Sequence, residues 1–174
     1  MYQTILAAVD LSELSLAVFK QALQLTKFCG AKLILLHVLS SDEEGFPILA
    51  TFPYDHFEPT LAEGYLESWR QLEQKGLQHL KTFADHAQQE GIKIETLQMA
   101  GNPGQIIRDL ARDRAVNLIM MGNRGRSGLS ELLLGSQSNY VMHHAPCSVQ
   151  VVKVPVPKLE PLVATANLTK STGN

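Results

Sequence analysis

The chain has 174 residues, of which 45% are hydrophobic, and its 15 basic and 17 acidic residues leave a formal net charge of −2. This length and composition suit one soluble domain with a complete hydrophobic core. Binding to a nucleic-acid backbone relies on clustered lysines and arginines, which this sequence lacks, so nucleic acid is not expected as the main partner.

The sequence shows no pattern for export or membrane insertion. Its first residues lead directly into a strand pattern, and no apolar run approaches the roughly 18 residues of a membrane span. Cys29 and Cys147 match neither a disulfide framework nor a metal-ligand spacing, so both are expected to be reduced and mostly buried. We therefore expect a cytoplasmic protein without a membrane partner.

The first part of the chain is predicted to form two strands with a helix between them. Residues 4–9 and 31–38 are apolar through their middles, as expected of strands covered on both faces. Between them, apolar residues recur at spacings of three and four, which indicates a helix with Ser12 as its N-cap and Gly30 at its end.

Residues 40–65 interrupt the regular alternation of strands and helices. The segment is rich in proline and aromatic residues and has no periodicity. A loop of this length is expected to be a flap packed against its own domain, or else a lid or a surface for a partner.

The rest of the chain returns to alternating helices and strands. A long helix is predicted over 61–90, with Leu66 and Trp69 among its core residues, and residues 92–99 alternate like a strand at a sheet edge. Asn102 and Pro103 indicate the start of another helix. A buried strand over 116–121, a helix over 136–144 and a last strand over 148–154 follow, and the tail 155–174 is predicted to be disordered.

Five strands that alternate with helices predict an α/β fold in one domain over residues 1–154. Such chains form a parallel sheet with right-handed crossovers and helices on both faces. Ligands of these sheets bind beyond the carboxyl ends of the strands, where the strand order reverses.

A glycine-rich loop follows the predicted strand 116–121. It contains Gly122 and Gly125, and a second small-residue turn, Gly135-Ser136, begins the next helix. Glycines let the backbone approach a bound group closely, and the N–H groups at a helix start favour negative charge. This arrangement is suited to holding a phosphate, although glycine and serine also occur in ordinary turns.

The spacing resembles the phosphate-binding signature of the universal stress protein family: Gly122, two residues, Gly125, nine residues, Gly135, Ser136. The resemblance extends to Asp10 and Ser12, to His37-Val38 and to Ala145-Pro146-Cys147, and covers about residues 1–154. It implies a Rossmann-type fold, like that of the adenine nucleotide alpha hydrolases, with strand order 3-2-1-4-5. Asp10 and the glycine loop then face one crevice.

The resemblance also implies roles for individual residues toward ATP, or toward ADP or AMP. Gly122 and Gly125 would hold the loop against ribose and phosphates, while Gly135 and Ser136 would donate to the phosphates. The backbone of Val38 would pair with the edge of adenine. The other residues assigned to the site are Gln137 and Ser138 at the start of the helix, and Val9 and Met121 on either side of the ring.

Charged residues near the predicted site leave alternatives open. Arg124 and Arg126 could make charge-assisted contacts with phosphates or remain solvated. Asp10 could contact the adenosine, bind a Mg²⁺ or Mn²⁺ ion held by the phosphates, or cap the first helix. The histidines, His37 and His79 among them, are expected to be structural or solvated, and no Ser, His and acid arrangement is visible.

The preferred function is a homodimeric, adenine-nucleotide-binding regulator of the stress response with at most slow ATP hydrolysis. The alternatives are a nucleotide-dependent enzyme, either an ATPase or an adenylyl transferase, and an interaction module without nucleotide. A P-loop would need Gly-Lys-Ser/Thr, and a dinucleotide fingerprint would need Gly-x-Gly-x-x-Gly after the first strand, where Asp10-Leu11-Ser12-Glu13 has no glycine. The dimer is expected to form through the last strand, Val149–Val154. This strand lies at an apolar edge of the sheet, which a two-fold partner can cover.

Overall fold

The computed structural model describes residues 1–41, 43, 46, 59–123 and 135–153. Gly125, Arg124 and Arg126 lie outside the described residues, as do the tail 155–174 and much of the predicted insertion. The predictions that concern them stay predictions.

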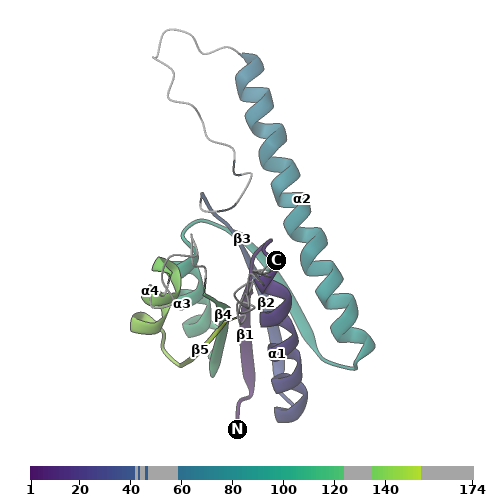
Figure 1. Ribbon diagram of the computed structural model, residues 1–174, viewed down its shortest axis with the longest axis vertical. Coiled ribbons are helices and arrows are strands. Elements are labelled where there is room, and N and C mark those ends of the chain that lie inside the picture. The colour runs from purple at the N-terminus through teal and green to yellow at the C-terminus, as the bar shows by residue number, and fades with distance from the viewer. Residues whose placement is uncertain (42, 44–45, 47–58, 124–134, 154–174) are drawn as a thin grey trace, which may run out of the picture.

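Five parallel strands form one sheet in the order β3-β2-β1-β4-β5 (Figure 1). This confirms the expected strand order and its reversal between β1 and β4. The strands are β1 (Thr4–Val9), β2 (Lys32–Leu39), β3 (Ile94–Ala100), β4 (Leu118–Gly122) and β5 (Ser148–Val152). Four of them begin and end close to the predicted bounds, while β5 ends at Val152 rather than at 154.

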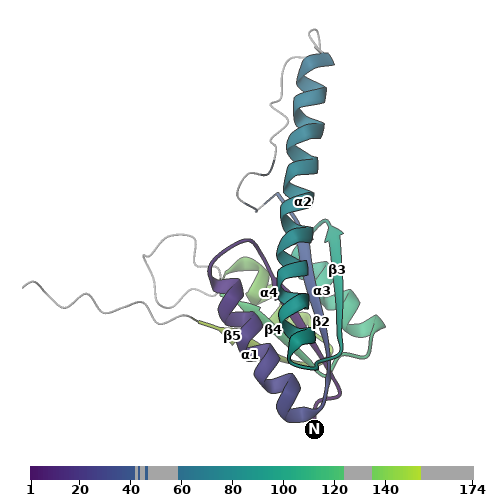
Figure 2. The ribbon, with the colours of Figure 1, turned by 90° about the vertical axis from the view of Figure 1, so that its right-hand side faces the viewer.

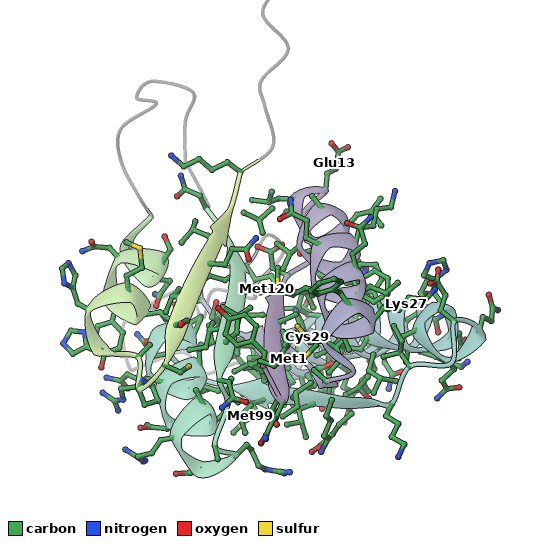
Figure 3. All side chains as sticks on the ribbon, turned by 90° about the horizontal axis from the view of Figure 1, so that it is seen from below. Met1, Glu13, Lys27, Cys29, Met99 and Met120 are labelled. Carbon is green, nitrogen blue, oxygen red and sulfur yellow. The ribbon has the colours of Figure 1, made fainter. Side chains whose placement is uncertain are left out.

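Helices cover both faces of the sheet, as predicted. Helices α1 (Leu14–Cys29) and α2 (Pro59–Gln89) pack on one face, and α3 (Pro103–Asp113) and α4 (Ser136–His144) pack on the other (Figures 1 and 2). Strand side chains alternate between the two faces, so Leu35 joins the α1 and α2 core while Leu36 joins the α3 and α4 core. Figure 3 shows Met120 in the interior, between the sheet and α1.

The predicted helix ends are confirmed at two places and wrong at one. Gly30 ends α1 in the left-handed conformation at φ 64°, and Asn102 caps α3 by accepting a hydrogen bond from the Gln105 N–H at 3.1 Å. Ser12, however, does not cap α1, because the N-cap position is Glu13 and the Ser12 hydroxyl donates to the Asp10 carboxylate instead.

Helix α2 is longer than the sheet that it covers. Its 31 residues span about 46 Å, whereas the eight residues of β2 span about 26 Å. The amino-terminal turns of α2 therefore extend beyond the sheet (Figure 2). Leu66 is 50% exposed and Trp69 is only half-buried, so the prediction that both lie in the core is wrong.

Two further findings concern the cysteines and the membrane. Cys29 and Cys147 are free thiols, but each is half-buried rather than mostly buried, because each lies at the margin of its core. None of the described helices combines the length and the apolar character needed to cross a membrane.

Candidate functional site

The candidate site lies at the carboxyl ends of β1 and β4, where the strand order reverses. Asp10 directly follows β1, and Gly122 ends β4. The register pairs Ala8 with Met121, so the two strands end at the same level. Helix α1, which follows β1, packs on one face of the sheet, and α4, which follows β4, packs on the other. In parallel sheets, ligands bind beyond the strand ends at such a reversal.

One hydrogen bond joins the two ends of the glycine loop. The Asn123 side-chain oxygen accepts from the Gly135 N–H at 2.9 Å, and the Asn123 N–H donates to the Val152 carbonyl at 3.1 Å. Asn123 therefore fixes the start of α4 against the end of β4. Sequence reasoning missed this residue because its partner lies 12 residues further along the chain.

The start of α4 combines one exposed and one buried serine. Ser136 is exposed at the first position of this nine-residue helix, where backbone N–H groups and the helix dipole favour an anion. Ser138 is 2% exposed, and its hydroxyl donates to the Gly135 carbonyl at 2.9 Å. Ser138 thus stabilises the first turn, and a phosphate contact from it would require that bond to be exchanged.

Gln137 connects the two helices on this face of the sheet. Its side-chain oxygen accepts from the Gly104 N–H at 2.9 Å, at the start of α3. The structure therefore shows Gln137 as a link between α4 and α3, and its predicted contact with a nucleotide stays a prediction.

Asp10 organises the turn that leads into α1. Its Oδ1 accepts hydrogen bonds from the Ser12 N–H at 2.9 Å and from the Ser15 hydroxyl at 2.7 Å, in addition to the Ser12 hydroxyl. These hydrogen bonds hold the carboxylate in one orientation. The alternative that Asp10 is the N-cap of α1 is wrong, because Glu13 occupies that position.

The apolar residues near the crevice differ from the predicted pair. Val38, Ala8 and Met121 all join the core on the α3 and α4 face, whereas Val9 packs on the opposite face with α1. Val9 and Met121 therefore cannot enclose one ring between them. The alternation of side chains along β1 puts Ala8, rather than Val9, on the side of Met121.

Gly122 allows a close contact between β4 and α1. A Cβ atom at this position would lie 2.6 Å from Cδ2 of Leu14, which is closer than two carbon atoms approach. The glycine therefore serves the packing of the first α1 turn, in addition to any contact with a ligand.

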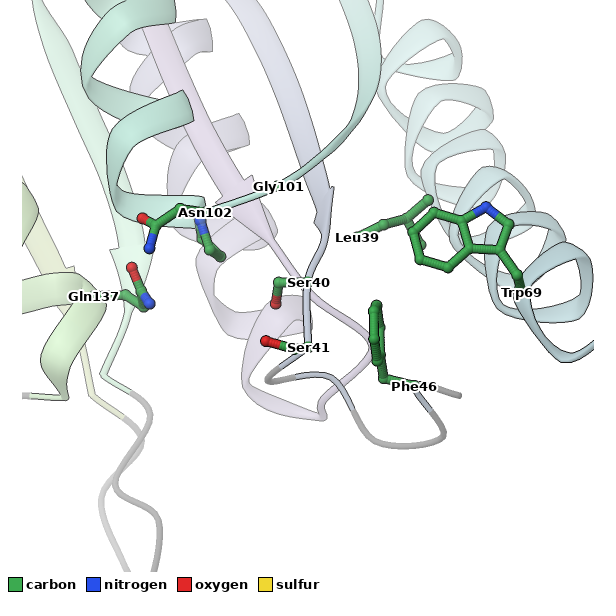
Figure 4. Close-up of a pocket in the computed structure, with 9 residues that line it drawn as sticks. Leu39, Ser40, Ser41, Phe46, Trp69, Gly101, Asn102 and Gln137 are labelled. Carbon is green, nitrogen blue, oxygen red and sulfur yellow. The ribbon is translucent and has the colours of Figure 1, made fainter. Parts of the chain in front are cut away.

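A pocket of about 350 Å³ lies beside the crevice, beyond the ends of β2 and β3 (Figure 4). Ser40 and Ser41, just after β2, and Asn102, at the start of α3, line its polar part. Leu39, Phe46 and Trp69 line its apolar part, and Phe46 meets Trp69 edge to face with ring centroids 5.5 Å apart. Sequence reasoning placed none of these residues in the site.

Polar side chains also lie beneath α2, next to the pocket. His37 Nε2 and Glu43 Oε1 are 2.8 Å apart, and both side chains are buried. Burial lowers the pKa of His79 below the usual range of imidazole, and His37 adds to this effect, whereas Asp10 and Glu43 oppose it. Among the described residues, no group of three His, Cys, Asp or Glu side chains could hold a metal ion.

Comparisons with known proteins agree with this geometry. The sequence profile of the Universal stress protein family matches residues 1–153. Universal stress protein Sll1388 of Synechocystis sp. is 32% identical over 152 residues, which cover 87% of this chain and 98% of that protein. Universal stress protein YxiE of Bacillus subtilis is 30% identical, with coverage of 88% and 100%.

Solved structures of similar proteins share the fold. The structure of protein MJ0577 superposes with a TM-score of 0.71 at 26% identity and covers 89% of this chain and 98% of that one. A universal stress protein solved in complex with cAMP superposes with a TM-score of 0.57 at 25% identity, with coverage of 87% and 96%. The match over nearly the whole described domain shows that this chain belongs to the universal stress protein family.

Proposed function

We propose that this protein binds an adenine nucleotide, with ATP as the first candidate and ADP or AMP as alternatives, in the crevice between β1 and β4. The observation that carries the proposal is the Asn123–Gly135 hydrogen bond, which holds the start of α4 at the end of β4. An anion in that position meets the backbone N–H groups of a helix start. The related structure with bound cAMP supports the same class of ligand.

The described residues fit the phosphates of a nucleotide. Ser136 is exposed at the helix start and offers a hydroxyl and a backbone N–H, and Gly122 keeps the end of β4 free of a side chain. Gly125 and Arg124 would complete the loop around the phosphates. The backbone of Val38 would pair with the edge of the base, and Val38, Ala8 and Met121 share the core on the α3 and α4 face.

A divalent cation would reach the site only together with the nucleotide. Asp10 is the carboxylate placed at the crevice, and phosphate oxygens would supply most other ligands to Mg²⁺ or Mn²⁺. In calorimetric titrations with ATP, Asp10→Ala should weaken binding more with Mg²⁺ present than without it. An equal loss in both conditions would show that Asp10 has no metal role.

We further propose a regulatory rather than a catalytic role. Among the described residues of the site, Asp10 is the one candidate general base. The Oδ1 atom of Asp10 already accepts three hydrogen bonds within its own turn. We therefore expect ATP hydrolysis well below about 1 per second, the lower range of ordinary enzymes. Faster turnover would favour the enzymatic alternative. The proposed setting is the cytoplasm, and the proposed assembly is a homodimer.

Three variants test the site itself. Asn123→Ala removes the acceptor for the Gly135 N–H, so we expect at least about a tenfold loss of ATP affinity in calorimetry. Asn123→Asp keeps an acceptor but adds a negative charge, so its loss should shrink as salt is added. Asn117→Ala is the matched control, because the Asn117 side chain accepts from the N–H groups of Gln3 and Thr4 at the amino-terminal ends of β1 and β4, the opposite end of these strands.

The result that supports the proposal is a loss in both Asn123 variants with Asn117→Ala binding like the wild type. Mass spectrometry of small molecules that co-purify with the protein would identify the natural nucleotide. Folded Asn123 variants that bind ATP as tightly as the wild type, or a wild-type protein that binds no adenine nucleotide, would contradict it.

A further inference from the structure

The first turn of α4, which carries the proposed phosphate site, rests on the start of α3. Gln137 and Tyr140 make this contact from α4, and Gly104 makes it from α3. Figure 4 shows the Gln137 side chain turned toward Asn102, which directly precedes α3. The first turn of α4 is therefore held by α3 as well as by the end of β4.

The start of α3 takes one of its hydrogen-bond partners from α4. Pro103, at the first position of α3, has no N–H group. The Gln105 N–H donates to the Asn102 side chain at 3.1 Å, and the Gly104 N–H donates to Gln137 Oε1 at 2.9 Å. The N–H groups of a first helical turn have no partner inside their own helix. The bond from Gly104 therefore ties the first turn of α4 to the first turn of α3.

Gly104 permits this close contact because it has no side chain. A Cβ atom there would lie 2.7 Å from Cδ1 of Tyr140 and 2.9 Å from Oε1 of Gln137, which is closer than such atoms approach. One turn further along α3, the Arg108 guanidinium donates to the Tyr140 hydroxyl and lies 5.7 Å from the centroid of the Tyr140 ring. Two successive turns of α4 are therefore seated on two successive turns of α3.

We propose that Gln137 is a positioning residue of the nucleotide site: through Gly104, it holds the first turn of α4 where Ser136 and the backbone N–H groups meet the phosphates. The inference rests on the proposed function, and it assigns Gln137 a role through α3 instead of a contact with the ligand. Without this bond, the first turn occupies the binding arrangement for a smaller fraction of the time, which lowers the apparent affinity by that fraction. Adenosine has no phosphates, so its affinity does not depend on this turn.

Calorimetry on the full chain, with ATP and with adenosine, tests the proposal. Gln137→Met removes the amide oxygen that accepts from Gly104. We expect about fivefold weaker ATP binding, the scale of one neutral hydrogen bond, and unchanged adenosine binding. Gln137→Glu keeps an oxygen acceptor, so at high salt, where its added charge is screened, it should bind ATP like the wild type at the same salt. Gly104→Ala disturbs the same contact from α3 and should weaken the binding of ATP but not of adenosine.

The matched control is Asn139→Ala, which removes an exposed amide side chain from the same helix. It should bind both ligands like the wild type, and thermal unfolding should show each variant folded. Wild-type ATP affinity in Gln137→Met or in folded Gly104→Ala, or an equal loss for ATP and adenosine, would overturn this inference and leave the proposed function standing.

The comparison of Gln137→Glu with Gln137→Met separates a positioning role from a direct contact. An equal loss of ATP affinity in both variants at high salt would overturn the inference, because it would indicate that the amide group itself contacts the nucleotide. A wild-type protein that binds no ATP would overturn both this inference and the proposed function.

Discussion

His37 and Glu43 form a hydrogen-bonded pair inside the protein, with Nε2 and Oε1 2.8 Å apart and side chains 0% and 2% exposed. His37 belongs to β2, and Glu43 follows the end of that strand by four residues. Buried polar groups of this kind are costly unless they are paired, so the pair specifies one path for the chain. Phe46, which lines the pocket, follows Glu43 by three residues, and its N–H donates to the Glu43 carbonyl at 3.1 Å.

We predict that Glu43→Ala lowers the free energy of unfolding by about 2 kcal/mol, because it leaves a buried imidazole nitrogen without its partner. Glu43→Gln should lower the free energy of unfolding clearly less, since the amide oxygen can still accept from the Nε2–H of His37. Urea unfolding measures both values. Two variants of equal stability would show that the hydrogen bond does not determine the local structure.

The sequence predicted His37 as structural or solvated, but it did not predict that the side chain is buried with Glu43 as its partner. Periodicity identifies which residues of a strand are buried, whereas Glu43 lies in an irregular segment that has no period. A similar limit explains why Trp69 and Leu66 were wrongly predicted to lie in the core. The apolar stripe along α2 shows which residues share a helix face, yet the length of the sheet beneath it decides how many of them are covered.

The candidate site was predicted in part. The glycine spacing placed Gly135 and Ser136 at the crevice because strand order and parallel connections fix where each strand ends. Asn123 and the pocket residues depend on contacts between distant segments, which no local pattern encodes. Val9 was misassigned because β1 alternates its side chains between two covered faces, so Ala8 rather than Val9 lies on the side of Met121.

The contact between His37 and α2 predicts a second effect on stability. A Cβ atom at Gly76 would lie 2.4 Å from His37 Nδ1, so Gly76→Ala forces the buried ring or the helix to move. We expect a loss of about 1–3 kcal/mol in the free energy of unfolding. The control is Gly64→Ala on the same helix, where an added Cβ meets nothing within 4 Å. In this control, the free energy of unfolding should rise by about 0.5–1 kcal/mol, because alanine favours the helix more than glycine does.

Thermal unfolding of the two glycine variants, recorded side by side, checks this prediction. The expected result is a lower melting temperature for Gly76→Ala and an equal or higher one for Gly64→Ala. A Gly76→Ala protein as stable as the wild type would mean that the interior beneath α2 adjusts without cost.

His79 predicts a dependence of stability on pH. Burial lowers its pKa in the folded protein, so the folded state binds fewer protons than the unfolded state below the usual imidazole pKa of 6.5. The contribution of His79 is therefore complete above about pH 6.5 and decreases as the pH falls through this value toward the lowered pKa. Urea unfolding between pH 8 and pH 5 should show the decrease, and His79→Gln should reduce its slope. An unchanged slope in that variant would assign the pH dependence to other groups.

The last prediction concerns assembly through β5. This strand ends the sheet, and its half-buried Val149 and Val151 alternate with exposed Ser148 and Gln150. A strand edge with apolar residues favours pairing with another chain, and a two-fold dimer would cover it. We therefore expect light scattering to show a dimer for the wild type and a monomer for Val151→Lys.

The opposite edge of the sheet supplies the control for this experiment. Thr96 is an exposed residue of β3, the other terminal strand, so Thr96→Lys adds the same charge where no dimer contact is proposed. It should remain a dimer. A dimer that persists in Val151→Lys but dissociates in Thr96→Lys would place the interface at β3. In that case the β5 edge must be protected from pairing by other means, because β4 covers only one of its two sides.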